Sequence, residues 1–496
     1  MKNLDTVYRI QREVAVLQGI ISLLDWDLQT YMPKGATINR ANQMSQISKE
    51  IHEKITSKEL RESIDEISKN IDKLSKKDRV VVERLRKDVE KLEKIPVSFM
   101  EELSKVTGLA HNAWEEAKEK SDFSIFQPHL EKIVEMKRKQ ASYLDLLGHP
   151  YNSLIDIFEE GMTTEVLAEK FGKLKEGLLT LLEKIKKSHV YGSESLSTEG
   201  FSIEVQKEVS NDIIRLMGLP MSKSRIDQSV HPFTTWIGPG DVRITTRYEK
   251  DPAMSLLSTS HEAGHAMYQL DLPEEYVYTV VYDGASMGLH ESQSRFWENM
   301  ITKSHLFWEF YFKEFKQKFS KQLEDVSFEK WYNHINAVRP SMIRIKADEV
   351  TYCLHVILRF EIEKGLIEGS IEVKDLPKIW NEKMKELLGV EPKNDAEGVL
   401  QDVHWSGGMF GYFPSYALGT IYAAQLFDKL MKDQPEAKEK ILNGDLSSIK
   451  EWLEKNVHSY ARTMKADDIV KKVCGEGLNI DKYIEYLNKK YLDIYK

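Results

Sequence analysis

The fold of this chain is best approached from one stretch, Ser260-His261-Glu262-Ala263-Gly264-His265-Ala266-Met267. It contains the pattern H-E-x-x-H, and residues four apart lie on one face of a helix. Both imidazoles can therefore reach one metal ion, while Glu262 beside them can contact a metal-bound water without taking a coordination place. The flanking apolar positions that predict a buried helix are Leu256, Leu257, Ala263, Met267 and Leu270. Gly264 costs about 1 kcal/mol in a helix interior, which indicates the close approach of another backbone or of a substrate.

A third metal ligand is expected downstream, because a catalytic zinc site uses three protein ligands and leaves a fourth position open. The segment that follows is Gly288-Leu289-His290-Glu291-Ser292-Gln293-Ser294-Arg295-Phe296-Trp297. Glu291 lies 26 residues after His265, which is long enough for one connection and a returning helix. His290 is the rival ligand, but two histidines and a glutamate form a recurring catalytic zinc set. Ser294 or Glu298 would then lie close enough to contact the ligands from behind.

A di-iron site is the alternative to a single zinc ion. Glu262 and His265 form the E-x-x-H element of a di-iron helical bundle, which requires a second such element on another helix. None of the other histidines has a glutamate three residues before it. The pattern therefore favours a single metal ion.

Helical patterns dominate the rest of the chain. Residues 1–190 carry Glu/Lys pairs at helical spacing, such as Glu83–Lys87, and Thr163 or Thr164 is a candidate N-cap. Helical patterns return from residue 251 to the end, without an internal repeat or a low-complexity linker. We predict a mostly α, single large domain over 1–496, with a helical part at 1–190 and a catalytic part at 191–496.

The clearest β signal lies between residues 190 and 250. It consists of His231-Pro232-Phe233-Thr234-Thr235-Trp236-Ile237, the turn Gly238-Pro239-Gly240, and Asp241-Val242-Arg243-Ile244-Thr245-Thr246-Arg247-Tyr248. Two runs of β-favouring residues around a Gly-Pro-Gly turn predict a hairpin or short sheet near the metal helix.

Bulk properties exclude several classes of protein. The net charge of -9 and a pI near 6.0 argue against a nucleic-acid partner, because there is no basic stripe. The apolar runs are shorter than the roughly 18 residues that a membrane span needs. Cys353 and Cys474 show no metal-type spacing and suit a reducing compartment, and the first residues form no signal-peptide core. We expect a cytoplasmic protein with no membrane partner.

Further motifs accompany the metal pattern and the H-E-S-x-S-R segment. They are His231-Pro232-Phe233, Asp241-x-Arg243-x-Thr245, Ile343-Arg344-x-x-Ala347-Asp348 and Gly398-x-x-Gln401-Asp402-x-His404-Trp405, with Asp25-Trp26-Asp27 and Met32-Pro33 near the N-terminus. In this order and at this length, the set closely resembles the carboxypeptidase Taq family (M32) of zinc metallocarboxypeptidases.

The resemblance carries several expectations. Members of this family are similar to the neurolysin and angiotensin-converting-enzyme group, which is almost wholly helical with a deep active-site groove. They release single residues from peptide C-termini with broad specificity, use zinc or in some preparations cobalt, and commonly form homodimers. The family's third ligand is the glutamate of its H-E-S motif, here Glu291. The N-terminal helices would then act as a lid over the groove.

The predicted chemistry assigns a role to three further groups. Glu262 would take a proton from the attacking water and deliver it to the leaving amine. His404 and Tyr416 would stabilise the oxyanion, because the wider group places a His and a Tyr there, and Tyr412 is the nearby rival. As isolated residues, His404 would more commonly be a core histidine and Tyr416 a packing aromatic.

An exopeptidase must also hold the free carboxylate of its substrate, and the planar fork of an arginine suits that task. Arg344 is the first candidate, followed by Arg243 and Arg295, although Arg295 could instead pair with Glu291. His231 would line the pocket, and the predicted hairpin could pair with the substrate backbone as an added strand.

Two other functions compete with a zinc-dependent carboxypeptidase acting on peptide substrates. An endo-acting oligopeptidase on the same scaffold would cut internal bonds and ignore a blocked C-terminus. A non-enzymatic helical protein with a structural zinc would normally close its site with four protein ligands, which the neighbouring Glu262 argues against.

Overall fold

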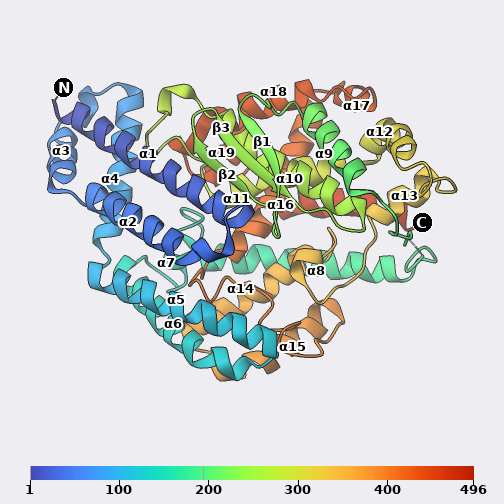
Figure 1. The fold of residues 1–496 in the computed structure, drawn as a ribbon, viewed down its shortest axis with the longest axis horizontal. Coiled ribbons are helices and arrows are strands. Elements are labelled where there is room, and N and C mark those ends of the chain that lie inside the picture. Colours follow the sequence, from blue (N-terminus) through green and yellow to red (C-terminus); the bar gives the residue numbers. More distant parts are fainter. Residues whose placement is uncertain (1, 194) are drawn as a thin grey trace.

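The computed structural model describes residues 2–193 and 195–496. The N-terminal half begins with helices α1 (Lys2–Thr30), α2 (Thr37–Ile55), α3 (Lys58–Ser68), α4 (Lys76–Glu93), α5 (Val97–Lys120), α6 (Phe123–Leu144), α7 (Asn152–Ile155), α8 (Thr164–Lys186) and α9 (Ile203–Met217). The prediction of a mostly helical chain with a small sheet is confirmed (Figure 1).

The rest of the chain contains the strands and the remaining helices. The strands are β1 (Ser224–Gln228), β2 (Thr234–Gly238) and β3 (Asp241–Thr246). They are followed by α10 (Pro252–Leu270), α11 (Met287–Arg295), the π-helix η4 (Phe296–Thr302), α12 (His305–Lys318), α13 (Phe328–Ile335), α14 (Tyr352–Glu368), α15 (Leu376–Leu388) and α16 (Phe413–Asp433). The chain ends with α17 (Ala437–Leu442), α18 (Ser447–Asn456), the 3₁₀ segment η7 (His458–Thr463), α19 (Ala466–Cys474) and α20 (Ile480–Ile494).

The sheet has one more strand than the sequence suggested. Strands β2 and β3 form the predicted antiparallel hairpin, with Thr235 opposite Arg243. Strand β1 joins the other side of β3 in parallel, with Ile226 opposite Ile244, so the order is β1-β3-β2. The sequence of β1, Ser-Arg-Ile-Asp-Gln, is short and polar, which is why its β signal was too weak to find.

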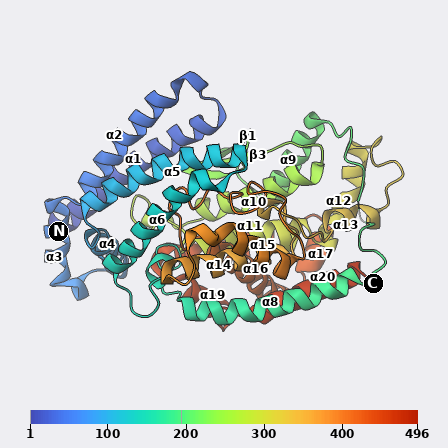
Figure 2. The same cartoon turned by 90° about the horizontal axis from the view of Figure 1, so that it is seen from below.

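The helices near the centre of the molecule are apolar on most of their surface. Helix α14 buries fourteen of its seventeen residues, which is typical of a helix packed on all sides. Helix α16 contacts both α14 and α11, so these three elements share one core. Helix α2, by contrast, has no buried residue and lies beside α1 at the edge of the molecule (Figure 2).

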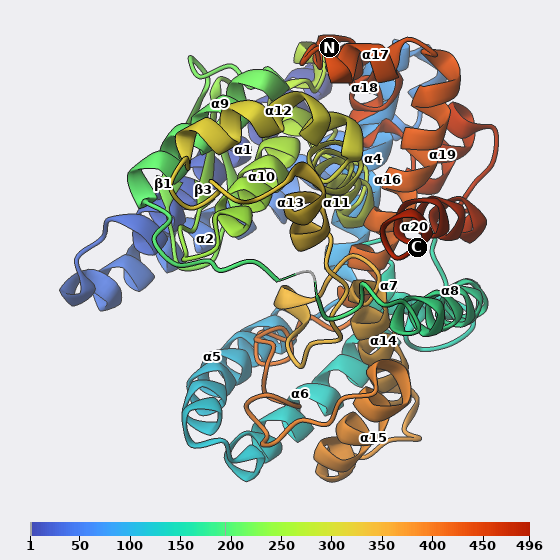
Figure 3. The same cartoon turned by 90° about the vertical axis from the view of Figure 1, so that its right-hand side faces the viewer.

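Figures 1 and 3 show how the elements are distributed around this core. Helices α5, α6, α14 and α15 lie on one side, and the sheet with α9, α10 and α12 lies on the other. Helix α10, which contains the H-E-x-x-H pattern, packs against α9, α11 and the sheet. In the described part of the chain, no helix has a stretch long and apolar enough to cross a bilayer.

Candidate metal centre and active site

Helix α10 carries the H-E-x-x-H pattern and starts from a well-defined cap. Asp251 accepts a hydrogen bond from the N–H of Ala253, and Pro252 occupies the first turn, where its missing N–H costs nothing. At Gly264, an added β-carbon would lie 2.8 Å from the Ser294 α-carbon. The glycine therefore admits the backbone of α11, the helix on which Glu291 lies.

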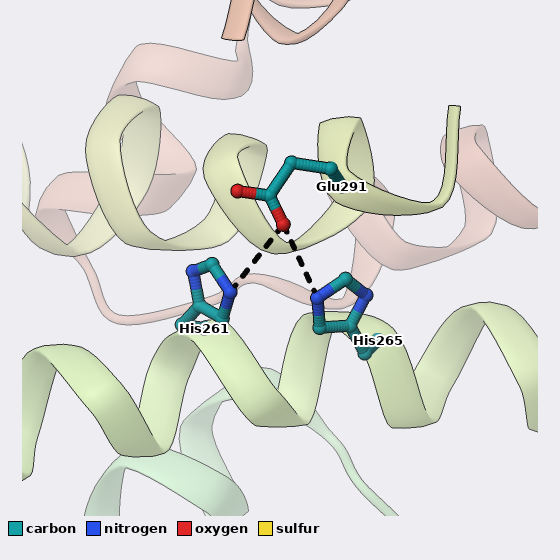
Figure 4. Close-up of side chains that lie close together, drawn as sticks. All are labelled: His261, His265 and Glu291. Atoms are coloured by element: carbon teal, nitrogen blue, oxygen red, sulfur yellow. Dashed lines mark ion pairs between the residues drawn. The ribbon is translucent and has the colours of Figure 1, made fainter. Parts of the chain in front are cut away.

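His261, His265 and Glu291 converge on one point (Figure 4). The Nε2 atoms of His261 and His265 lie 3.6 and 3.4 Å from Oε2 of Glu291. Ligand atoms on a tetrahedron about 2.0–2.1 Å from a zinc ion are about 3.4 Å apart, so the three atoms suit such an ion with a fourth position open. The donor set also fits zinc chemically.

Charged groups behind the three candidate ligands hold them in place. Oε2 of Glu298 lies 2.8 Å from Nδ1 of His261, which leaves Nε2 free to face a metal. Arg295 donates to Oε1 of Glu291 at 2.7 Å and to Glu298 at 3.1 Å. Burial opposes the ionised carboxylate of Glu298, but Arg295 and His261 outweigh it and lower its pKa to about 2. Arg295 likewise keeps the pKa of Glu291 below its usual value, so both carboxylates are ionised and available as acceptors.

His290 occupies a different position from its neighbour Glu291. Its Nδ1 lies 2.6 Å from Nδ1 of His265, on the far side of that ring from Glu291. Burial lowers the pKa of His290 to about 3, so its ring is neutral at physiological pH. It can therefore fix the orientation of His265 without adding charge.

Glu262 follows His261 on the same helix, and its carboxylate has a close polar neighbour. The Thr234 hydroxyl donates to Oε2 of Glu262 at 2.6 Å, and the Glu262 side chain is buried. Thr234 begins β2, directly after the motif His231-Pro232-Phe233. The sequence analysis missed this contact, although the position of Thr234 next to a motif was a usable signal.

His404 and Tyr416 meet, with Nε2 of His404 3.1 Å from the Tyr416 hydroxyl. Burial lowers the pKa of His404 to about 4, with Asp402 opposing and two arginines adding to the effect. The ring is thus neutral and can donate a hydrogen bond. The guanidinium carbon of Arg344 lies 4.8 Å from the centre of the Tyr416 ring, so the first-choice arginine belongs to the same cluster.

The arginine candidates all have carboxylate partners. Arg344 donates to Asp402 through Nε and Nη2 at 3.1 and 2.8 Å, and its Nη1 lies 3.4 Å from the Tyr352 hydroxyl. Arg243 donates to Asp241 at 3.0 and 2.9 Å and stacks on the Trp26 ring. Arg295 makes the pairs with Glu291 and Glu298 described above.

The other residues singled out in the sequence have partners outside the cluster of His261, His265 and Glu291. His231 is exposed in the connection between β1 and β2, where its carbonyl accepts from the Ser229 hydroxyl. Trp26 stacks with both Arg225 and Arg243, so the N-terminal motif packs against the sheet. Thr245 bonds to the Phe233 N–H at 2.9 Å and has a structural role.

Two buried glutamates support the segments that carry the site, and neither belongs to a recognisable sequence motif. Glu159 accepts a hydrogen bond from the Gly288 N–H at the start of α11. Glu363 accepts from Trp405 Nε1 at 2.8 Å and from the Gly411 N–H at 2.8 Å, on either side of the loop between His404 and Tyr412. Burial raises the pKa of both glutamates to about 7.

Comparison with known proteins agrees with this geometry. The pattern of the family described as carboxypeptidase Taq (M32) metallopeptidase matches residues 6–491. Carboxypeptidase 1 of Bacillus subtilis is 42% identical over 489 residues, which cover 98% of each chain. Thermostable carboxypeptidase 1 of Pyrococcus furiosus is 38% identical over 474 residues, or 95% of each chain. The crystal structure of the M32 carboxypeptidase from Deinococcus radiodurans R1 has a TM-score of 0.96 and 34% identity, with both chains covered completely. Since the family match extends over nearly its whole length, the chain belongs to the carboxypeptidase Taq (M32) metallopeptidase family.

Proposed function

We propose that the protein uses zinc, held by His261, His265 and Glu291, to release single residues from the free carboxyl end of peptides. Carboxypeptidases that are 36–42% identical over nearly the full chain, together with the family match, make it a metal-dependent carboxypeptidase. The observation that carries the proposal is the convergence of two Nε2 atoms and one carboxylate oxygen beside an acid that is not a ligand. Cobalt(II) is the alternative ion for the same donors.

A divalent ion bound there would polarise the scissile carbonyl and lower the pKa of a water molecule. Glu262 takes the proton of the attacking water and passes it to the leaving amine. Its carboxylate is held by the Thr234 hydroxyl at 2.6 Å, which leaves the other oxygen to receive the proton. Thr234 thus positions the base.

His404 and Tyr416 donate hydrogen bonds to the oxyanion of the tetrahedral intermediate. Their mutual distance of 3.1 Å places two donors side by side, and the lowered pKa of His404 keeps it neutral. Tyr412 contacts both rings and is the second candidate for the tyrosine.

Arg344 binds the terminal carboxylate of the substrate. Asp402 fixes two of its nitrogens, and the contact of Nη1 with Tyr352, at 3.4 Å, is long for a hydrogen bond. That arm of the guanidinium is therefore the one that can turn toward a substrate. Arg243 and His231 are the further candidates for contacts with the peptide.

One assay tests the proposal. The purified protein is given a blocked dipeptide with a free C-terminus and the corresponding C-terminal amide, each with and without a chelator. We expect release of the last residue from the free acid alone, and loss of that release with the chelator. Equal turnover of the amide would indicate an endo-acting oligopeptidase, and no turnover with metal fully bound would indicate a structural zinc site.

The proposal also includes a lid over the active site, a homodimer and a cytoplasmic location. Helix α1 lines a cavity together with Thr234, which supports a role for the N-terminal helices as a lid.

A homodimer contact is the second part of the proposal. Val16, Ile20 and Leu23 are exposed along one stripe of α1, as such a contact would require, and the molar mass in solution tests this. Cys353 and Cys474 are free, which is consistent with a cytoplasmic protein.

A further inference from the structure

A cavity of about 660 Å³ lies between the N-terminal helices and strand β2, and we call it the unprimed groove because it would hold the part of a peptide before the cleaved bond. It is lined by α1, α3 and α4 on one side, and by β2, the end of α10 and the segment 278–283 on the other. Thr234 lines it and its hydroxyl also donates to Glu262, so one residue of the cavity wall touches the proposed base. Its size is within the range of small-ligand sites.

The direction of the substrate follows from the proposed function, on which this inference rests. Arg344, His404 and Tyr416 form one cluster, and none of them lines the unprimed groove. A carboxypeptidase places a single residue on the side where the terminal carboxylate is held. The remaining residues must then extend the other way, along β2 and into the unprimed groove.

The charges in this groove do not balance. Its charged lining residues are Asp88, Asp283 and Arg462. Arg462 donates to both oxygens of Asp88, at 2.7 and 2.8 Å, so these two charges are paired. Asp283 accepts a hydrogen bond from the Gly284 N–H at 2.7 Å and forms no ion pair among the described residues, although Arg462 attracts it from a longer distance. One surplus carboxylate therefore faces the groove.

The backbone around this carboxylate is held in a costly conformation. Tyr278 has a φ of 65°, and Ala461 has a φ of 46° with a ψ of -146°. Such conformations cost of order 1–3 kcal/mol and persist where the surroundings impose them. The Arg462 N–H that follows Ala461 bonds to the Val281 carbonyl at 3.1 Å, so both strained segments meet at the wall that carries Asp283.

We propose that Asp283 binds the free α-ammonium group of short peptide substrates, so that the enzyme recognises both ends of the peptide. The ammonium supplies the missing positive charge, and the Asp88–Arg462 pair keeps the neighbouring wall neutral. Desolvation raises the pKa of Asp283 and Arg462 only partly opposes this, so a bound ammonium would further favour the ionised carboxylate. The preference for a free amino terminus should depend on the length of the peptide. An extended chain advances about 3.3 Å per residue, so only one peptide length brings the ammonium to Asp283.

The test compares alanine peptides ending in phenylalanine, from dipeptide to pentapeptide, each with a free and with an acetylated amino terminus. For the wild-type enzyme, kcat/KM should favour the free amine by about tenfold at one length, as expected for a hydrogen-bonded ion pair, and fall back for longer peptides. Asp283→Asn should bring this ratio close to one. Glu275→Gln, which removes an exposed negative charge outside the groove, is the matched control and should keep the ratio. Equal ratios in wild type and Asp283→Asn would overturn the inference.

Two additional arms separate the possible failures. Binding of the same peptides to metal-loaded Glu262→Gln, measured by calorimetry, should show the same preference for the free amine. If no peptide is cleaved, the proposed function fails, and the calorimetry still decides the role of Asp283. An acetylated peptide with lysine in place of its first alanine tests a side-chain ammonium. A gain that depends on Asp283 for lysine alone, without a gain for the free amino terminus, would overturn the assignment to the terminus.

Discussion

His261 illustrates how the fold assigns separate tasks to the two nitrogens of one ring. Glu298 lies 2.8 Å from Nδ1, and this contact directs Nε2 toward Glu291 and the metal position. Burial disfavours a charged imidazole, but Glu291 and Glu298 outweigh it and raise the pKa of His261. The same negative groups that would attract a proton would attract a metal ion, so the site is built for a cation.

Glu262 gives the sharpest prediction for a single residue. Glu262→Gln keeps the shape of the side chain and the contact with Thr234, but the amide cannot take up a proton. We expect kcat to fall by about 10²–10⁴, the usual contribution of a general base, with metal content unchanged. Turnover of a blocked dipeptide and metal analysis of the same sample measure both quantities. A metal-loaded variant with wild-type kcat would refute the assigned role.

Helix α11 owes its position to close contacts on opposite sides. Gly264 of α10 admits its backbone from one side, and Gly419 of α16 does so from the other. At its start, Ser286 caps the helix by accepting from the Leu289 N–H, and Glu159 accepts from the Gly288 N–H. The packing of whole helices therefore sets the position of the Glu291 backbone, and Arg295 holds its carboxylate.

Gly419 tests this packing. An added β-carbon would lie 2.5 Å from Cγ of Glu291, so Gly419→Ala must displace the ligand or the helix. We expect a loss of about 1–3 kcal/mol of stability from overpacking and a 10–100-fold weaker metal affinity. Denaturant unfolding and competition with a chelator measure the two effects. Gly108→Ala is the control, because nothing lies within 4 Å of its added β-carbon in α5, and wild-type metal affinity in Gly419→Ala would speak against the packing argument.

Glu159 gives α11 a dependence on pH. Burial raises the pKa of Glu159 to about 7 from 4.5, despite the Ser415 and Ser286 hydroxyls and the Gly288 N–H, which favour its charge. Because the pKa is raised in the folded state, this group stabilises the fold fully below pH 4.5, and the contribution is lost as the pH rises through 7. The shift of the Glu159 pKa from 4.5 to about 7 corresponds to about 3 kcal/mol of the free energy of unfolding.

Glu159→Gln imitates the protonated acid and should remove this dependence. The variant should gain about 3 kcal/mol relative to wild type between pH 4.5 and pH 8, measured as the difference of their free energies of unfolding in denaturant. The comparison at each pH cancels the titration of all other groups. A constant difference across this range would show that Glu159 is ionised in the folded protein throughout.

At the scale of the whole molecule, sequence patterns predicted the fold class and the metal motif. They did not predict the residues that hold the motif and its neighbouring helix in place. H-E-x-x-H and its apolar flanks define α10 locally, because helical periodicity and ligand spacing are properties of adjacent residues. The contacts of Thr234 with Glu262 and of Glu159 with Gly288 join residues far apart in sequence. Glu159 stands in no motif, and the motif before Thr234 does not say which residue that threonine contacts, so only the folded chain identifies these partners.

The partners of the three candidate arginines also could not be predicted from the sequence. A planar fork in a motif suggested a carboxylate clamp, and the structure gives Arg344, Arg243 and Arg295 carboxylate partners within the protein. Strand β1 was missed because two of its five side chains are charged and its apolar signal is weak. The carboxylate partners of the arginines, and the pairing of β1 with β3, come from residues that the local sequence pattern does not identify.

Removal of the metal tests the molecule as a whole, because the three proposed ligands come from two helices that are packed only in the folded state. An ion that binds the folded chain alone stabilises it by about 2.7 kcal/mol at a concentration one hundred times its Kd. Chelation should therefore lower Tm by several degrees, and added zinc should restore it. In calorimetric scans, Glu262→Gln should keep this zinc-dependent shift and His265→Ala should lose it, since only the histidine is a ligand. An equal shift in His265→Ala would mean that zinc stabilises the protein from another place, and the assigned metal centre would have to be abandoned.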